Sequence, residues 1–311
     1  MQVLLVANTS KPDAVEAALV AAEWLVEQGV SFEQIASERM VLGDEIMEEW
    51  SEKVEEFDLV VSFGGDGTIL RVVRLLSGSD IPLLAFNFGG LGFLAGAQSE
   101  DLIEALRAAI EEDVSYEERR LIEIEISFAA GESLVLPALN EAVVSRLDAG
   151  RVVSLDIEIN DKLFHSMRGD GLLVASATGS TAYALSAGGP LVHPDHDGLV
   201  IVPISEHSLK DWSLVTGSLD EVTIKPSAGN TQELLVYVDG EPLGPPLMSL
   251  GLSDWLDDEE AESEETQELL DAFKMLRIKE VSIRPSFAVL TLVKYGEMDF
   301  YQHLRQTFFK D

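Results

Sequence analysis

The sequence predicts an α/β domain with a parallel sheet, followed by a β-rich domain. Before residue 115, short apolar runs alternate with segments of helical periodicity, which is typical of parallel strands joined by helices. Near residue 119 the period changes to two, because Ile122, Ile124 and Ile126 alternate with polar residues as in a half-solvated strand. We therefore predict an α/β domain over 1–115 and a β-rich domain over 116–296. The tail, 297–311, is expected to pack back on the body and complete the first domain.

Length and composition bound the class of protein. The chain has 311 residues, enough for two domains with a sizeable core, and it contains no cysteine. The lack of cysteine excludes disulfides, thiolate metal sites and a cysteine nucleophile, and it fits a cytosolic setting. No apolar run approaches the ~18 residues that span a bilayer, and no signal peptide is visible. We expect a cytoplasmic protein without a membrane partner.

The charge is strongly negative, with 21 basic and 56 acidic residues and a net charge of −35 at pH 7. Nucleic acid is therefore not expected as a partner, since neutralising its phosphates requires a basic surface. A phosphorylated substrate must be attracted by Mg²⁺ and by local arginines against the overall field. We interpret the acidity as adaptation to high salt, where screening relieves self-repulsion. An ordinary acidic cytosolic protein is the alternative.

The first elements follow a simple order. Residues 3–7 form a buried strand, and a helix capped by Ser10 follows and ends at Gly29. Residues 33–56 are mixed and acidic, and we expect at least one helix among them. A further apolar strand is predicted over 81–86, before a helix that Ser99 caps.

The stretch DLVVSFGGDGTILRVVRLL, residues 58–76, lies at the centre of the first domain. A buried strand over 59–63 leads into a glycine turn over 64–68, and the rest has helical periodicity. The three glycines can take positive φ and let the main chain approach a ligand, and Thr68 can cap the helix. A strand, a tight turn and a helix N-terminus form the arrangement by which open α/β sheets bind phosphate groups.

Asp66 is the unusual member of this turn, because a carboxylate repels phosphate. It has a role there if it contacts Mg²⁺ or takes a proton from a hydroxyl group. The alternative is a glycine β-turn in which Asp66 merely caps the helix. The turn alone leaves both interpretations open.

Two polar turns are predicted in the second domain. In RGDGLLVASATGSTAYALSAGGP, residues 168–190, a short strand over 172–175 precedes a hydroxyl-rich turn over 177–181, which suits a ribose or an amide. The alternative is a loop whose hydroxyls cap the next helix. In LNEAVVSR, residues 139–146, the Asn140-Glu141 pair before a buried strand could bind ribose hydroxyls or form a plain turn. Asn160-Asp161 suits a hairpin turn.

Together these motifs resemble the NAD kinase family. They are GGDGT at 64–68, NFGGLGFL at 87–94, NEAVV at 140–144, and the run from Asp-Gly at 170 through TGSTAY to SAGGP at 190. The motifs keep the order of the family, and the likeness extends from residue 3 through the Asp-Gly-Glu at 239–241 to the tail. GGDGT is shared with lipid kinases and GGDG with phosphofructokinases, whereas TGSTAY together with Asn-Glu is far more specific.

The resemblance implies phosphorylation of the adenosine-ribose 2′-hydroxyl of NAD by ATP or polyphosphate, giving NADP. It implies Asp66 as the general base, Mg²⁺ bound with ATP, no tightly bound organic cofactor, and a site between the two domains. Homodimers or homotetramers are implied as well. The alternatives are a lipid kinase of the same superfamily and a nucleotide-binding regulator that lost turnover.

The resemblance also assigns nucleotide contacts. Phe93 and Leu94 form an apolar wall for the adenine, Asp170 binds the nicotinamide amide, and Arg71 lies near the phosphates. The basic residues Arg151 and Arg168 face the dinucleotide, although surface ion pairs explain them equally well. No set of protein ligands for a metal is predicted. The remaining predicted contacts are Gly64, Gly65, Gly67, Thr68, Asn140, Glu141, Thr178, Thr181, Ala182, Tyr183, Ala184, Leu185, Ser186 and Glu241.

Three features depart from the family pattern. Ser176-Ala177 stands before TGSTAY where the family usually has Thr-Pro, which frees φ and loosens the turn by up to ~1 kcal/mol. Glu241 replaces a glutamine, so its contact is in doubt. The acidic insertion over 253–271 is longer than expected, and we predict a solvated or disordered loop without chemistry.

Overall fold

The computed structural model describes residues 1–40, 45–76, 78–89, 92–147, 150–208, 212–243, 277–296 and 299–309. The predicted acidic insertion lies outside these ranges. The chain divides into two compact units, residues 1–120 with 287–311, and residues 121–286. Residues 287–296, which the sequence suggested for the β-rich domain, group with the first unit. The reason is that Leu292 pairs in parallel with Leu83 there.

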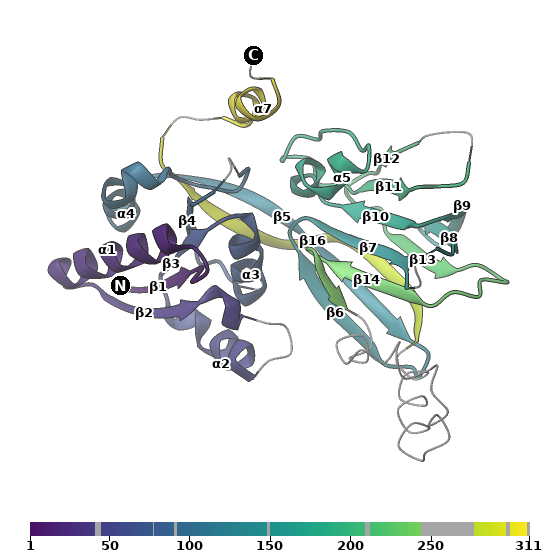
Figure 1. Cartoon of the computed structure of the whole chain (residues 1–311), viewed down its shortest axis with the longest axis horizontal. Coiled ribbons are helices and arrows are strands. Elements are labelled where there is room, and N and C mark those ends of the chain that lie inside the picture. The colour runs from purple at the N-terminus through teal and green to yellow at the C-terminus, as the bar shows by residue number, and fades with distance from the viewer. Residues whose placement is uncertain are drawn as a thin grey trace. The chain divides into compact units, whose positions relative to one another are not determined.

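The first unit contains a parallel sheet with helices on both faces (Figure 1). Helices α1 (Pro12–Gln28) and α4 (Leu102–Ile110) cover one face, and α3 (Asp66–Leu76) covers the other, with α2 (Glu45–Lys53) against it. The predicted α/β class is confirmed. In spatial order the strands are β2 (Ser31–Ala36), β1 (Gln2–Ala7), β3 (Leu59–Gly64), β4 (Leu83–Asn87) and the C-terminal part of β16 (Ile278–Lys294).

The central strands of this sheet form where the sequence predicted them. Strands β1, β3 and β4 read as near-continuous apolar runs because both of their faces are buried, as is usual for parallel sheets. Helix α1 ends at Gly29 in the left-handed region, as predicted. The N-caps predicted at Ser10 and Ser99 are wrong. Lys11 is the N-cap of α1 and makes no side-chain cap bond, and Ser99 opens a 3₁₀ turn before α4.

The second unit is β-rich, as predicted, and consists mainly of antiparallel strands. One sheet has the order β12 (Leu214–Val215), β11 (Val200–Ile204), β10 (Gly171–Ala175), β7 (Glu141–Arg146), β14 (Leu234–Val238) and β15 (Glu241–Leu243). The other strands are β9 (Lys162–Gly169), β8 (Val153–Ile159), β13 (Val222–Pro226), the N-terminal part of β16, β5 (Ser115–Phe128) and β6 (Ser133–Ala138).

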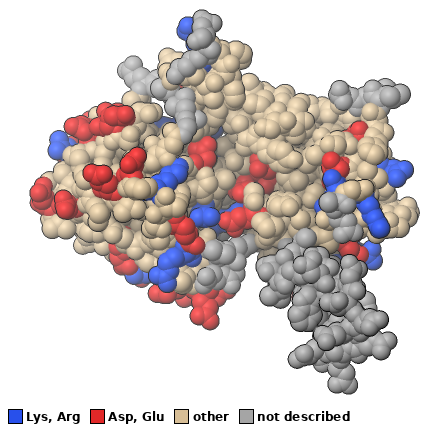
Figure 2. Space-filling view, viewed as in Figure 1, with Lys and Arg blue, Asp and Glu red and all other residues tan. Residues whose placement is uncertain are grey.

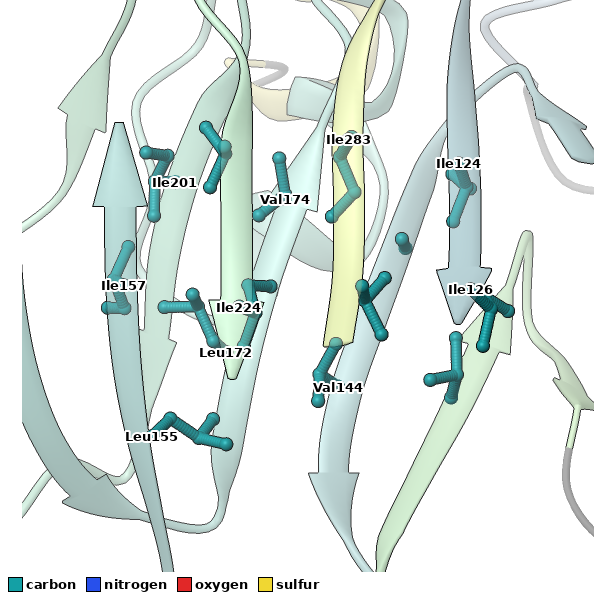
Figure 3. Close-up of a cluster of buried hydrophobic side chains, with 14 of the residues drawn as sticks. Ile124, Ile126, Val144, Leu155, Ile157, Leu172, Val174, Ile201, Ile224 and Ile283 are labelled. Carbon is teal, nitrogen blue, oxygen red and sulfur yellow. The ribbon is translucent and has the colours of Figure 1, made fainter. Parts of the chain in front are cut away.

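The core of the second unit lies between these two groups of strands (Figure 3). Val144, Leu172 and Ile201 from one side meet Ile157 and Ile224 from the other, and all five are fully buried. Alternate residues of β8 point into this core and are apolar, whereas β10 is apolar and buried on both of its faces.

The remaining elements of the described chain are short. The predicted hairpin is confirmed, because Asn160 and Asp161 both have positive φ, as a two-residue turn between β8 and β9 requires. The short helix α5 (Tyr183–Ser186) packs Ala184 on the outer side of the sheet that contains β10. Helix α7 (Phe300–Phe308) is the last element. No helix within the described ranges is long and apolar enough to cross a bilayer.

Candidate active site

The glycine turn lies at the carboxyl edge of the parallel sheet. Strand β1 has β2 on one side and β3 on the other. The strands after β2 are therefore added on the opposite side of β1, and the strand order reverses between β1 and β3. Ligands of open α/β sheets bind at such a topological switch point. The main chain links the loops there, because Asn8 N–H donates to Phe63 O at 2.9 Å and Phe88 N–H donates to Gly64 O at 2.6 Å.

The glycines of the turn do not use positive φ, which is one of the two purposes that the sequence predicted for them. None of Gly64, Gly65 and Gly67 has positive φ. A Cβ atom on Gly64 would lie 2.1 Å from Thr68 Oγ1, so this glycine is needed for close packing, whereas the space over Gly67 is open. Thr68 does not cap α3, because the helix begins at Asp66 and encloses the buried Thr68 in its first turn.

The carboxylate of Asp66 is held by the loop after β4. The backbone N–H groups of Phe93 and Leu94 hydrogen-bond it. Burial raises the pKa of the Asp66 carboxyl above its ordinary value, although these N–H groups and the charges of Lys11 and Lys294 act in the opposite direction. A Cβ atom on Gly92 would lie 2.2 Å from Asp66 Oδ1. The second motif therefore positions Asp66 through its main chain.

A charged cluster that the sequence did not reveal surrounds this carboxylate. Lys294 Nζ lies 3.1 Å from Glu117 Oε2, and Arg119 Nη2 lies 2.6 Å from Glu117 Oε1. Burial lowers the pKa of Lys294, and the neighbouring Asp66 opposes this shift. Lys294 is the last residue of β16. It comes near Asp66 because β16 pairs with β4, and this pairing cannot be read from the sequence. Lys11 could have been found, because it follows the predicted strand 3–7.

The residues predicted to contact adenine and phosphate lie in the same unit. Leu94 is buried, with 2% of its surface exposed. The ring of Phe93 packs against two residues of α7, with centroid distances of 4.5 Å to His303 and 5.6 Å to Phe308. Arg71 Nη1 donates to Ser37 O at 3.4 Å. An adenine wall at Phe93 and Leu94 therefore stays a prediction.

In the second unit, Asp239 supports the Asn140-Glu141 turn. Its carboxylate accepts the backbone N–H groups of Leu139 at 2.9 Å, Asn140 at 2.8 Å and Glu141 at 3.1 Å. Asp239 has a φ of 48° and is buried with 6% exposure. A buried carboxylate with three N–H donors fixes the turn ahead of β7.

Ser176 joins this turn to the hydroxyl-rich turn. Its hydroxyl donates to Leu139 O at 2.5 Å and accepts from Gly179 N–H at 3.1 Å, and its own N–H donates to Asn140 O at 2.8 Å. A Cβ atom on Gly179 would lie 2.1 Å from Asn140 O, so only glycine allows this approach. The departure from Thr-Pro at 176–177 thus keeps a hydroxyl group that connects the two turns.

A cavity of about 450 Å³ opens beside these turns. Glu141, Asp170 and Tyr183 of the predicted contacts line it. Burial and the charge of Asp239 raise the pKa of Glu141 to about 8. Arg146 also lines the cavity, and its Nε lies 2.7 Å from Asp170 Oδ1, although no sequence pattern selected this arginine.

The other predicted contacts of the second unit have different surroundings. Arg151 and Arg168 are exposed, whereas Thr178 and Ala184 are buried. Thr181 Oγ1 donates to Thr178 O at 3.0 Å. Among the described residues of the second unit, the predicted contacts that do not line the 450 Å³ cavity are Asn140, Arg151, Arg168, Thr178, Thr181, Ala182, Ala184, Leu185, Ser186 and Glu241.

Comparison with known proteins agrees with these motifs. The sequence profile of the ATP-NAD kinase N-terminal domain matches residues 3–114, and that of the ATP-NAD kinase C-terminal domain matches residues 139–247. The NAD kinase of Heliobacterium modesticaldum is 36% identical over 248 residues, which cover 78% of this chain and 86% of that protein. The NAD kinase of Thermobifida fusca is 34% identical over 251 residues, 76% of each chain.

Solved structures share the fold. The crystal structure of an NAD kinase from Archaeoglobus fulgidus in complex with ATP has a TM-score of 0.68 and 23% identity, covering 99% of this chain and 97% of that one. Yeast NADH kinase complexed with NADH has a TM-score of 0.76 and 22% identity, covering 98% and 87%.

The fold and the two sets of turns define a phosphotransferase. The relatives identify which one, and the chain belongs to the NAD kinase family. A lipid kinase and a silent regulator are not favoured, because the relatives named above are NAD kinases.

Proposed function

We propose that the chain transfers the terminal phosphoryl group of ATP to the adenosine-ribose 2′-hydroxyl of NAD, with Asp66 as general base. The observation that carries this proposal is the position of the Asp66 carboxylate, at the first residue of α3 and directly after β3. Two backbone N–H groups orient it, and burial raises its pKa. A base whose pKa is closer to the working pH accepts a proton more readily than an ordinary aspartate.

Recognition of the dinucleotide is assigned to the second unit. Glu141, Asp170 and Tyr183 line a cavity of about 450 Å³, which is within the size range of small-molecule sites. Arg146 holds Asp170 through its Nε at 2.7 Å and so orients the carboxylate predicted to bind the nicotinamide amide. We retain Arg71, Arg151 and Arg168 as candidate contacts for phosphate groups.

Magnesium is proposed to be held chiefly by the phosphates of ATP. Among the described residues no group of three or more histidines, aspartates or glutamates could hold a metal ion. Mg²⁺ in kinases needs fewer protein ligands, because one or two carboxylates and the substrate phosphates suffice. When bound, the ion neutralises charge on the phosphates.

The wider setting is proposed from the family resemblance. We propose a homodimer or homotetramer in the cytoplasm, with NAD and ATP or polyphosphate as small-molecule partners. Light scattering after size-exclusion chromatography measures the oligomer, and a monomer at micromolar concentration contradicts this part of the proposal.

The test of the function is a panel of ATP and polyphosphate against NAD and NADH, in the presence of Mg²⁺, with NADP or NADPH as the measured product. We expect ATP and NAD to give NADP. In Asp66→Asn, turnover should fall by ~10²-fold or more while dinucleotide binding is largely retained. Asp101→Asn, in the 3₁₀ turn before α4, removes the same charge and should leave turnover unchanged.

A wild-type protein that makes no NADP(H) in any arm of the panel contradicts the proposed function. Unchanged turnover in Asp66→Asn contradicts the assigned base alone.

A further inference from the structure

Lys11 places a positive charge directly over the glycine turn. Its Nζ donates to Phe88 O at 2.6 Å, in the loop after β4. A Cβ atom built on Gly65 would lie 3.3 Å from this Nζ, and one built on Gly89 would lie 3.1 Å from it. The ammonium group therefore sits between the loops that follow β3 and β4, although its own chain position follows β1.

These three loops meet at one edge of the sheet. Strands β1, β3 and β4 are parallel neighbours, so their carboxyl ends point the same way. The reversal of strand order between β1 and β3 marks the ligand crevice of such sheets. Lys11 follows β1 on one side of this point, and the glycine turn follows β3 on the other.

The charge of Lys11 acts on Asp66. The positive charges of Lys11 and Lys294 both lower the pKa of the Asp66 carboxyl, although the larger effect of burial raises it. Lys294 is paired with Glu117 at 3.1 Å, whereas in the described part of the chain Lys11 forms no ion pair within 4.0 Å. An ammonium group has three N–H donors, and the contact with Phe88 O uses one of them.

Lysine at this position is poorly explained by folding. Lys11 is the N-cap of the 17-residue helix α1, where its side chain makes no capping bond. Serine, threonine, aspartate and asparagine are the residues that stabilise an N-cap. A cation at a helix N-terminus is also disfavoured by the helix dipole. The hydrogen bond to Phe88 O uses one donor of the ammonium group, and a residue that breaks the capping rule here indicates a role beyond starting the helix.

We propose that Lys11 binds the transferred phosphoryl group of the donor, a chemistry that rests on the proposed function. In the transfer, a bond forms between the acceptor oxygen and the terminal phosphorus. The bond between that phosphorus and the bridging oxygen breaks, and its electron pair stays on ADP. The hydroxyl proton passes to Asp66. Lys11 neutralises charge on the phosphoryl oxygens, which is the main requirement of such transfers.

The experiment compares wild type with Lys11→Met and Lys11→Arg. We expect Lys11→Met to lower kcat/KM for ATP by ~10²-fold, within the 10²–10³-fold range for losing one charge-stabilising group. The KM for NAD should stay within about twofold, because the change removes one interaction with the donor. Lys11→Arg should recover part of the loss. The Tm of Lys11→Met should stay within about 4 °C of that of wild type, since losing the hydrogen bond to Phe88 O is offset by removing a cation from the helix N-terminus.

The matched control is Lys53→Met, which removes the same charge from the same unit, where Lys53 pairs with Glu33 at 2.5 Å. It should leave the KM for ATP unchanged. Calorimetry with Mg²⁺-tripolyphosphate gives a readout independent of turnover, and Lys11→Met should bind it at least about tenfold more weakly than wild type.

Two results overturn the role of Lys11: an unchanged kcat/KM for ATP in Lys11→Met, or a KM for NAD that rises by about tenfold or more. Tripolyphosphate binding that is unaffected by Lys11→Met also overturns it. A wild type that binds tripolyphosphate through Lys11 but makes no NADP instead contradicts the proposed function and leaves the phosphate site in place.

Discussion

Glu141 keeps its proton at neutral pH because burial and the charge of Asp239 raise its pKa to about 8. A protonated carboxyl group donates one hydrogen bond and accepts another, whereas a carboxylate only accepts. Glu141 lines the cavity assigned to the dinucleotide. We therefore expect it to meet a ribose hydroxyl as a donor below pH 8.

This pKa makes the stability of the protein depend on pH. The native state keeps the Glu141 proton up to about pH 8, whereas the unfolded chain loses it near the ordinary value of 4.5. Between these values the native state binds more protons, so the free energy of unfolding falls as pH rises. Glu141→Gln should therefore be more stable than wild type at pH 8, by on the order of 2–4 kcal/mol. Denaturant titrations from pH 5 to pH 9 measure this.

The expected advantage of Glu141→Gln shrinks as the pH falls from 8 towards 5, because the unfolded chain regains the Glu141 proton as the pH approaches its ordinary pKa of 4.5. Glu125→Gln, on β5 of the same unit, serves as the control and should show no such trend. An advantage that is constant with pH would mean that Glu141 does not titrate as described.

Single residues differ in how well the sequence reveals them. Asp66 could be predicted because a carboxylate in a glycine turn has no structural reason to be there. Lys294 and Glu117 could not, since neither lies in a motif and only the strand order brings them near Asp66. Asp239 was seen only as part of a motif, because its three N–H partners lie about a hundred residues away.

At the scale of elements, the two turns of the second unit depend on one another. Asp239, at the turn between β14 and β15, fixes the turn before β7, and Ser176 joins that turn to the hydroxyl-rich turn after β10. A change at Asp239 should therefore affect both turns, even though it lies in neither.

Asp239→Ala removes the acceptor of three buried N–H groups. Each unpaired group costs about 1–3 kcal/mol, and partial relaxation reduces the sum, so we expect a loss of about 2–5 kcal/mol in the free energy of unfolding. Asp239→Asn keeps one acceptor oxygen and tolerates the φ of 48°. It should lose less than half as much, which urea denaturation can measure.

Asp220→Ala is the comparison, because Asp220 also accepts a backbone N–H, from Gly217 at 2.8 Å, but at an exposed turn. We expect it to cost less than about 1 kcal/mol. Equal losses in Asp239→Ala and Asp220→Ala would show that the buried turn does not depend on the Asp239 carboxylate.

Elements were predictable where burial leaves a clear pattern. The apolar runs of β1, β3 and β4 and the Asn160-Asp161 hairpin were found, because parallel strands and tight turns restrict their residues strongly. Strand β2 was missed, since SFEQIA at the edge of the sheet is partly exposed and mixed in polarity. The positive φ predicted for the glycine turn is absent, because Gly64 is required by its close packing against Thr68 and not by its backbone conformation.

For the molecule as a whole, the charge of −35 opposes folding. On the face shown in Figure 2, acidic side chains are spread widely and are interspersed with fewer basic ones. Repulsion among them acts over the Debye length, which is about 10 Å at 0.1 M salt and about 3 Å at 1 M. Salt should therefore stabilise this protein, whereas it weakens the attraction of isolated surface ion pairs in ordinary proteins.

We predict that the Tm rises by at least about 5 °C between dilute buffer and 2 M KCl at pH 7, which corresponds to about 1–2 kcal/mol for a chain of this size. Differential scanning calorimetry measures the rise. The control is the same KCl series near pH 4.2, the isoelectric point, where net repulsion vanishes and the rise should largely disappear. An equal rise at both pH values would assign the effect to salting-out of apolar surface. Full stability and activity in dilute buffer would contradict adaptation to high salt.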